Sequence, residues 1–355
     1  MQKIKTADVD NLIGIIPEWV NVDSINQDIV LMSRIMLYRN FSNYVFPEKA
    51  GLLNMVRLKK EIFSIIDSYK NKNDFRYFDG TNMNDEEFLL LKEYLMLGTD
   101  CFKTEKEKTG IIVDDILSTF ILVNADNHIA LIKNISDSSF KKSFSNIYSI
   151  EQYFEKYLTY AFSGTYGYLT SSLNTSGTGL KLEVLLDLTG ISNKNKFDSV
   201  DIIIKNFKIA IEKFPYEGYE TTSFYKISNR ITIGMDENEI IDNMIKAVKE
   251  IISYERQNRE ELTDDLRFKD KIIRNYAIFK DALLMSDNEI LQTVSLLRLG
   301  IVFGWIADID LKATKRILIE TGTRYLRMKY KLNEHDFPSE IMQIRKNHIN
   351  KILGE

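Results

Sequence analysis

The chain has 355 residues, of which 44% are hydrophobic and 28% charged, and its net charge is −4 at pH 7. This composition is typical of an ordinary soluble globular protein, and the negative charge argues against broad nucleic-acid binding, which needs a basic surface. A single core rarely grows beyond about 250–300 residues, so two domains are expected.

Membrane insertion and export are not expected. No window approaches about 18 uninterrupted apolar residues, and the start of the chain, MQKIKTADVDNLIG, lacks an apolar signal core. The single cysteine, Cys101, cannot form an internal disulfide or a Cys-based metal site, which favours a cytoplasmic protein. The three histidines, His128, His335 and His348, are too scattered to predict a zinc site.

The first distinctive segment is LMSRIMLYRNFSNYVFP, residues 31–47, in which Arg34 and Arg39 interrupt an apolar run. Isolated arginines are mostly solvated, so the segment is either a half-buried stretch whose arginines face water or a cationic site for phosphate. Residues 118–135 then predict two strands joined by a short polar turn that carries Asp126. A turn held on a rigid hairpin is a good place for chemistry.

Helical and strand patterns alternate through the next hundred residues. Apolar residues at helical spacing predict an amphipathic helix over 199–214, and alternation predicts a strand over 229–235. Asp236 with Glu239 resembles a capping box and begins a long helix that reaches about Tyr254.

The composition changes after Tyr254 to the charged, apolar-poor stretch ERQNREELTDD. We therefore predict a first domain over 1–254, a charged connector over 255–261 and a helical domain over 262–355. Residues 311–355 hold 10 Lys/Arg against 5 Asp/Glu, which is either a solvated face or a surface for a partner.

The commonest phosphate-binding motifs, Gly-x4-Gly-Lys-Ser/Thr and Gly-x-Gly-x-x-Gly, are absent from the sequence. Four other segments, in order, resemble motifs of the guanido kinases, and those of the bacterial protein-arginine kinases in particular. They are PEWVNVDSINQDIVLMSRIMLYRNFSNYVFP, VNADNHIAL, GYLTSSLNTSGTGLKLEVLLDL and YKISNRITIG. The resemblance implies an α+β fold, with an antiparallel sheet flanked by helices and then a helical domain. It also implies ATP with Mg²⁺ as cofactor, and a dimer.

The resemblance assigns the family's functional positions to residues of this chain. Asp126 takes the place of the catalytic glutamate, and Ser172 that of the cysteine beside the guanidinium. Two family arginines are replaced by Met36 and Ala130, and the family's Arg-Gly-x-x-Gly-Glu loop falls near Glu212 or Lys213. The nucleotide-binding positions implied are Ser33, Arg34, Arg39, His128, Gly177, Thr178 and Lys181.

A regulatory motif also differs. The protein-arginine kinases carry Arg-Asp-x-x-Arg-Ala near the C-terminus, associated with binding phosphoarginine. Here the matching stretch is HDFPSE, from His335 to Glu340. A dianionic phosphoguanidinium needs a cationic fork, and Glu340 would repel it.

Three interpretations follow. The first is a pseudokinase or strongly impaired kinase with a regulatory or scaffolding role, in a homodimer or beside an active kinase paralogue or adaptor. The second is an active ATP-dependent kinase of protein arginines, with Asp126 as the carboxylate and Arg34, Arg39 and Lys181 holding the phosphates. The third is an interaction protein that uses its basic helical tail.

Overall fold

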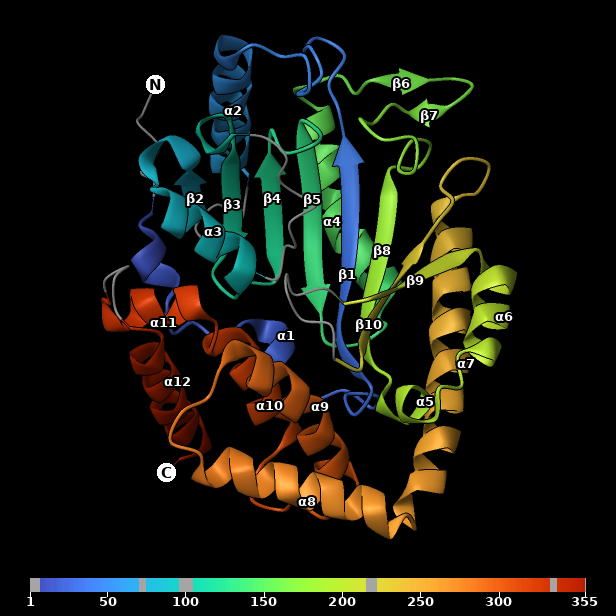
Figure 1. Cartoon of the computed structure of the whole chain (residues 1–355). Coiled ribbons are helices and arrows are strands. Elements are labelled where there is room, and N and C mark those ends of the chain that lie inside the picture. The colour runs from blue at the N-terminus through green and yellow to red at the C-terminus, as the bar shows by residue number, and fades with distance from the viewer. Residues whose placement is uncertain (1–6, 70–74, 96–104, 215–221, 333–336, 355) are drawn as a thin grey trace.

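The central element is an eight-stranded antiparallel sheet with strand order β2-β3-β4-β5-β1-β8-β10-β9 (Figure 1). The computed structural model describes residues 7–69, 75–95, 105–214, 222–332 and 337–354. The strands are β1 (Val30–Arg39), β2 (Phe75–Asp79), β3 (Gly110–Asp114), β4 (Thr119–Val123), β5 (Ile129–Ile135), β8 (Leu180–Asp187), β9 (Ile209–Lys213) and β10 (Phe224–Asn229), with β6 (Phe162–Ser163) and β7 (Gly167–Tyr168) as a separate pair.

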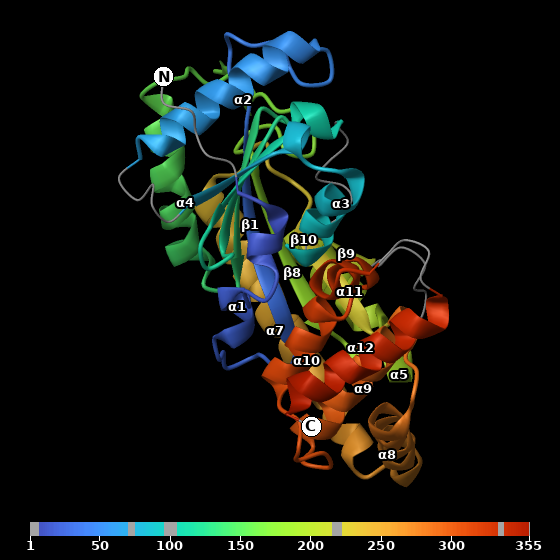
Figure 2. The ribbon, with the colours of Figure 1, turned by 90° about the vertical axis from the view of Figure 1, so that its left-hand side faces the viewer.

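Helices cover one face of the sheet completely and the other only in part. Ile35 and Leu37 of β1 join the core formed with helices α2 (Leu52–Asp67), α4 (Phe140–Glu155) and α7 (Glu237–Thr263). Successive side chains of a strand point to opposite faces, so Met36 packs on the other side, in the core that includes α3 (Asp85–Tyr94). Figure 2 shows α4 and α7 on one side of the sheet and α3 on the other.

The C-terminal region is helical and packs below the sheet in the view of Figure 1. Its own core extends through Trp19, Leu31 and Leu185 into the part of the chain that forms the sheet, which we call the sheet domain. The fold expected from the resemblance, an antiparallel sheet with helices followed by a helical domain, is therefore confirmed. The remaining helices are η1 (Val9–Leu12), α1 (Glu18–Asn21), η3 (Gly80–Asn82), η5 (Lys106–Lys108), α5 (Thr189–Lys194), α6 (Asp198–Phe207), α8 (Leu266–Asp281), α9 (Asp287–Val302), α10 (Leu311–Glu320), α11 (Thr323–Tyr330) and α12 (Pro338–Leu353).

The expected hairpin and one predicted helix start are confirmed, and two predictions are wrong. Strands β4 and β5 pair as predicted, and Asp236 caps α7 through the backbone N–H of Glu239. The helix predicted over 199–214 ends at Phe207, because Lys208 adopts a left-handed conformation (φ 54°) and the following residues form the edge strand β9. The apolar residues near the end of 199–214 fit the spacing of a helix as well as the alternation of a strand.

The strand predicted over 229–235 is also misplaced, since β10 ends at Asn229. There the side chain of Asn229 accepts a hydrogen bond from the N–H of Leu182 (2.7 Å) and donates one to the carbonyl of Leu180 (3.0 Å). After this the chain leaves the sheet, and the hydroxyl of Thr232 donates to the carbonyl of Ser176 (2.5 Å).

The charged stretch 255–261 continues α7, which runs beyond Tyr254 to Thr263. Glu255 and Arg259 are buried and form an ion pair (2.6 Å). Arg259 also donates to the backbone carbonyl of Asp187 (2.9 Å), whose carboxylate pairs with the fully buried Arg298 of α9 (3.2 Å). These charges therefore join the two parts of the molecule, which explains why the stretch contains few apolar residues.

Basic residues of 311–355 are used in similar contacts. Arg324 of α11 pairs with Glu93 of α3 (3.2 Å), and Lys312 of α10 pairs with Asp23 (2.7 Å). Part of the positive excess of this region therefore holds its helices against the sheet domain.

Candidate active site

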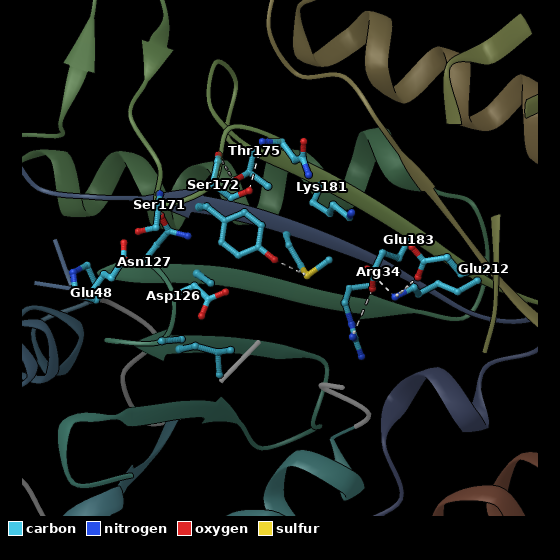
Figure 3. Close-up of a pocket in the computed structure, with 18 of the residues that line it drawn as sticks. Arg34, Glu48, Asp126, Asn127, Ser171, Ser172, Thr175, Lys181, Glu183 and Glu212 are labelled. Atoms are coloured by element: carbon cyan, nitrogen blue, oxygen red, sulfur yellow. Dashed lines mark hydrogen bonds and ion pairs between the residues drawn. The ribbon is translucent and has the colours of Figure 1, made fainter. Parts of the chain in front are cut away.

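A cleft with a volume of about 720 Å³ lies on the partly covered face of the sheet (Figure 3). This size is within the range of small-molecule sites. Its floor takes alternate residues from neighbouring strands, since the side chains at i and i+2 share a face. The floor residues are Leu122 of β4, Ala130 of β5, Met32, Arg34, Met36 and Tyr38 of β1, Lys181, Glu183 and Leu185 of β8, Lys226 of β10 and Glu212 of β9.

One end of the cleft carries carboxylates, amides and hydroxyls. Asp126 from the β4–β5 turn and Glu48 from the β1–α2 loop lie there, near Ser171 and Ser172 (Figure 3). Asn127 fixes two segments at this end, because its Oδ1 accepts hydrogen bonds from the N–H of Ser171 (2.8 Å) and from Nδ2 of Asn40 (3.0 Å). We call this region, with Glu48, Asp126 and Ser172, the carboxylate end.

Ser172 lies in a tightly bonded turn. Its carbonyl accepts hydrogen bonds from the N–H groups of Thr175 and Ser176 (both 3.1 Å) and from the hydroxyl of Thr170 (2.7 Å). Its own hydroxyl accepts from the N–H of Asn174 (3.3 Å). The backbone therefore places the exposed Ser172 at the cleft. Its hydroxyl cannot supply the negative charge that a cysteine thiolate would bring to this position.

The opposite end carries paired charges. Arg34 donates from Nε to Oδ1 of Asn134 (2.9 Å) and lies 3.7 Å from Glu183. Lys226 lies 3.8 Å from Glu183 and 3.3 Å from Glu212. Figure 3 shows Arg34, Glu183 and Glu212 together, away from Asp126. We call these residues, with Lys226, the cation end.

Apolar side chains separate the two ends. Met36 and Ala130 are each 2% exposed and, with Leu122, belong to the apolar core on this face of the sheet. The hydroxyl of Tyr38 donates to Sδ of Met36 (3.2 Å). The positions at which the resemblance implies two arginines therefore provide no cation to the cleft.

The structure brings four of the predicted site residues to this cleft: Arg34, Asp126, Ser172 and Lys181. The phosphate role assigned to Arg39 is corrected, because its side chain leaves β1 on the opposite face. There its Nε pairs with the buried Glu151 (2.9 Å), and its guanidinium lies 3.4 Å from the centre of the Tyr168 ring. Ser33 is fully buried, and as the neighbour of Arg34 in the strand it also points away from the cleft.

His128 is a buried structural residue rather than a nucleotide ligand. Its Nδ1 accepts from the N–H of Phe41 (2.9 Å), so the N–H at Nε2 donates to the carbonyl of Val45 (2.9 Å). Burial lowers the pKa of the imidazole from 6.5 to about 4, which keeps the ring neutral. His128 thereby fixes the loop that brings Pro47 and Glu48 to the cleft.

Gly177 and Thr178 form a backbone turn outside the cleft lining. Gly177 has φ +101°, and a Cβ there would lie 2.5 Å from the carbonyl oxygen of Thr232. The carbonyl of Thr178 accepts a hydrogen bond from Nη1 of Arg39 (3.0 Å). The turn therefore requires glycine for its conformation and close packing.

Sequence reasoning missed Glu48, Glu183 and Lys226, and left open whether Glu212 or Lys213 belongs to the site. Glu212 lines the cleft. Alternation along β8 could have found Glu183, because it shares a face with Lys181. In the C-terminal motif, His335 and Asp336 lie outside the described residues, and Glu340 is exposed in the first turn of α12.

Comparison with known proteins gives the family. Residues 57–258 match the family described as ATP:guanido phosphotransferase, C-terminal catalytic domain. The chain belongs to the guanido kinase family. Residues 265–353 match the protein-arginine kinase McsB C-terminal domain, so the guanido kinase domain is followed here by the helical domain of the bacterial arginine kinases.

Two protein-arginine kinases are similar to this chain over most of its length. The protein from Clostridium acetobutylicum is 30% identical, over 88% of this chain and 93% of its own. The protein from Clostridium novyi is also 30% identical, over 85% of this chain and 89% of its own.

Solved structures agree on the guanido kinase fold. The substrate-free duplicated taurocyamine kinase from Schistosoma mansoni has a TM-score of 0.58 at 17% identity and covers 74% of this chain and 40% of its own. Lombricine kinase has a TM-score of 0.55 at 18% identity and covers 71% of each chain.

The described residues contain neither a cluster of metal ligands nor a membrane-spanning helix. No three His, Cys, Asp or Glu side chains in this part of the chain come together as possible metal ligands. None of the described helices is long and apolar enough to span a membrane.

Proposed function

We propose that this guanido kinase homologue is strongly impaired in phosphoryl transfer and acts as a regulatory or scaffolding protein. The observation that carries the proposal is the apolar strip across the cleft floor, where Met36 and Ala130 stand at positions of family arginines. A transferred phosphoryl group needs prearranged cationic donors there, and the loss of one such donor commonly costs about 10²–10³ in rate.

The carboxylate end supports the same proposal. Asp126 is one methylene shorter than glutamate, which withdraws its carboxylate by about 1 Å, and such misplacement can cost about 10²-fold. Ser172 replaces the thiolate with an alcohol. Losses within one cooperative site do not simply multiply, but together they bring transfer close to background.

The described residues fit Mg²⁺-ATP poorly. In the enzymes that use it, Mg²⁺ is bound largely by the phosphates, so the phosphates must themselves be held by cations. Arg34 and Lys226, which could hold them, each lie beside Glu183.

An active protein-arginine kinase is the second candidate, and the comparisons favour it. The relatives that cover nearly the whole chain are named protein-arginine kinases. The cleft also brings Arg34, Lys181 and Asp126 together, as that activity would need. The two candidates share a fold and differ in turnover.

A side-by-side turnover assay separates them. The purified chain and the Clostridium acetobutylicum protein are incubated with Mg²⁺-ATP and an arginine-rich protein, and acid-labile phosphoarginine is measured by ³¹P NMR and mass spectrometry. We expect the chain to give no signal above the Asp126→Ala variant. Robust phosphoarginine that Asp126→Ala abolishes would establish the active kinase instead.

The scaffolding role concerns proteins of the cytoplasm, either an active kinase paralogue or its adaptor, bound as a homodimer or heterodimer. Sedimentation velocity of the chain alone, and then mixed with the paralogue, tests this. A monomer in both samples would contradict it.

A further inference from the structure

Glu183 is an unusual residue for the floor of a phosphate-binding cleft. It lies in the middle of β8, opposite Arg34 on β1 and Ser228 on β10. Lys181 and Leu185, two residues to either side, also line the cleft, so the pleat of the strand fixes the Glu183 side chain on the same face. A central strand paired on both sides cannot turn this carboxylate away from the cleft.

The carboxylate of Glu183 lies between two cations. Oε2 is 3.7 Å from Nη1 of Arg34, and Oε1 is 3.8 Å from Nζ of Lys226. The three side chains are only 4%, 15% and 20% exposed for Arg34, Glu183 and Lys226. Water screens this group weakly, so the interaction is stronger than that of a surface ion pair.

The second carboxylate, Glu212, is 58% exposed and lies 3.3 Å from Nζ of Lys226. It pairs opposite Lys226 across β10 and β9. Glu183 is therefore the inner and Glu212 the outer member of a carboxylate pair at the cation end.

We propose that Glu183 closes the cation end of the cleft to nucleotide, because its carboxylate lies against Arg34 and Lys226, the two cations of this end. This inference rests on the proposed function and names the residue that enforces it. A polyphosphate that entered this end would have to displace Glu183 from Arg34 and Lys226 or lie beside a fixed negative charge. Both options oppose binding of a polyanion.

The test is a calorimetric titration with two probes, Mg²⁺-ATP and sodium tripolyphosphate, at low ionic strength. The proteins are the wild type, Glu183→Gln, the double variant with Glu212→Gln, and Glu250→Gln, which makes the same charge change at an exposed position of α7. Gln keeps the shape of Glu and removes its charge. Far-UV circular dichroism and thermal melting confirm that each variant is folded.

We expect no measurable tripolyphosphate binding to the wild type or Glu250→Gln. Removal of one weakly screened charge should strengthen binding to Glu183→Gln by at least ~10-fold, enough to be measured, with a further gain in the double variant. Added salt should weaken the new binding.

The possible failures are distinguishable. If neither the wild type nor a folded Glu183→Gln protein binds either probe, the role of Glu183 is overturned and the proposed function stays intact. Equal gains in Glu183→Gln and Glu250→Gln also overturn it, because the effect would then come from overall charge. Micromolar binding of Mg²⁺-ATP to the wild type overturns this inference and removes a main support of the proposed function.

Discussion

Acidification should destabilise the sheet domain through His128. Its ring accepts a hydrogen bond from the N–H of Phe41 and donates one to the carbonyl of Val45, so protonation of Nδ1 would break the first. Burial lowers the pKa of the imidazole from 6.5 to about 4. The folded state therefore favours the neutral ring, and its contribution to stability is complete above the unfolded pKa.

The size of the effect follows from the two pKa values. Stability is lost as the pH falls from 6.5 toward 4. The difference of about 2.5 units between the two pKa values corresponds to a total loss of about 3 kcal/mol in the free energy of unfolding. At pH 5, between the two values, the loss is about 2 kcal/mol of the free energy of unfolding. Protonation of His128 should also loosen the loop that carries Glu48 to the cleft.

Urea denaturation followed by far-UV circular dichroism, at about pH 7.5 and pH 5, measures the effect. The matched variant is His128→Gln, which cannot titrate. It should be less stable than the wild type at pH 7.5, and the difference should shrink by about 2 kcal/mol at pH 5. Equal losses in both proteins between the two pH values would refute a neutral, buried His128.

Three further substitutions test the buried charges by chemical denaturation. Arg39→Met should cost about 3–5 kcal/mol because it leaves Glu151 buried without its cation, and adding Glu151→Gln should recover part of the loss. Asp187→Asn should cost a similar ~3–5 kcal/mol by leaving Arg298 unbalanced. Lys315→Met should stabilise the protein by up to about 3 kcal/mol at pH 7. Burial lowers the pKa of Lys315 to about 8, so the charged ammonium destabilises the folded state at this pH. That gain should shrink as the pH rises from about 8 to 10.5, and a destabilised Lys315→Met protein would contradict it.

Local pattern predicted the elements whose periodicity is unambiguous. The β4–β5 hairpin followed from two apolar runs joined by a short polar turn, and the capped start of α7 followed from the pair Asp236 and Glu239. The alternation of side chains along a strand separates Arg34 from Arg39. The two residues are five positions apart in one strand, so their side chains point to opposite faces.

The charge pairing in the cleft could not be predicted from the sequence. Arg34 and Glu183 are 149 positions apart, and they meet only because β1 pairs with β8 in one register. A shift of one residue would turn Glu183 to the other face. Lys226 joins them from a third strand, and no local pattern states which strands are neighbours.

The pattern of retained and replaced motif residues has a physical explanation. Arg39, His128 and Gly177 still match the guanido kinase motifs, and each is held by buried contacts away from the cleft. Met36 and Ala130, which depart from the motifs, face the cleft. A substitution at the first group would destabilise the sheet domain or its loops, whereas one at the second also changes what the cleft can bind. The surviving motifs are therefore evidence for the fold and carry little information about catalysis. Arg34 is the exception, since it faces the cleft and is retained, and its partner Glu183 is the reason that it does not by itself argue for a working kinase.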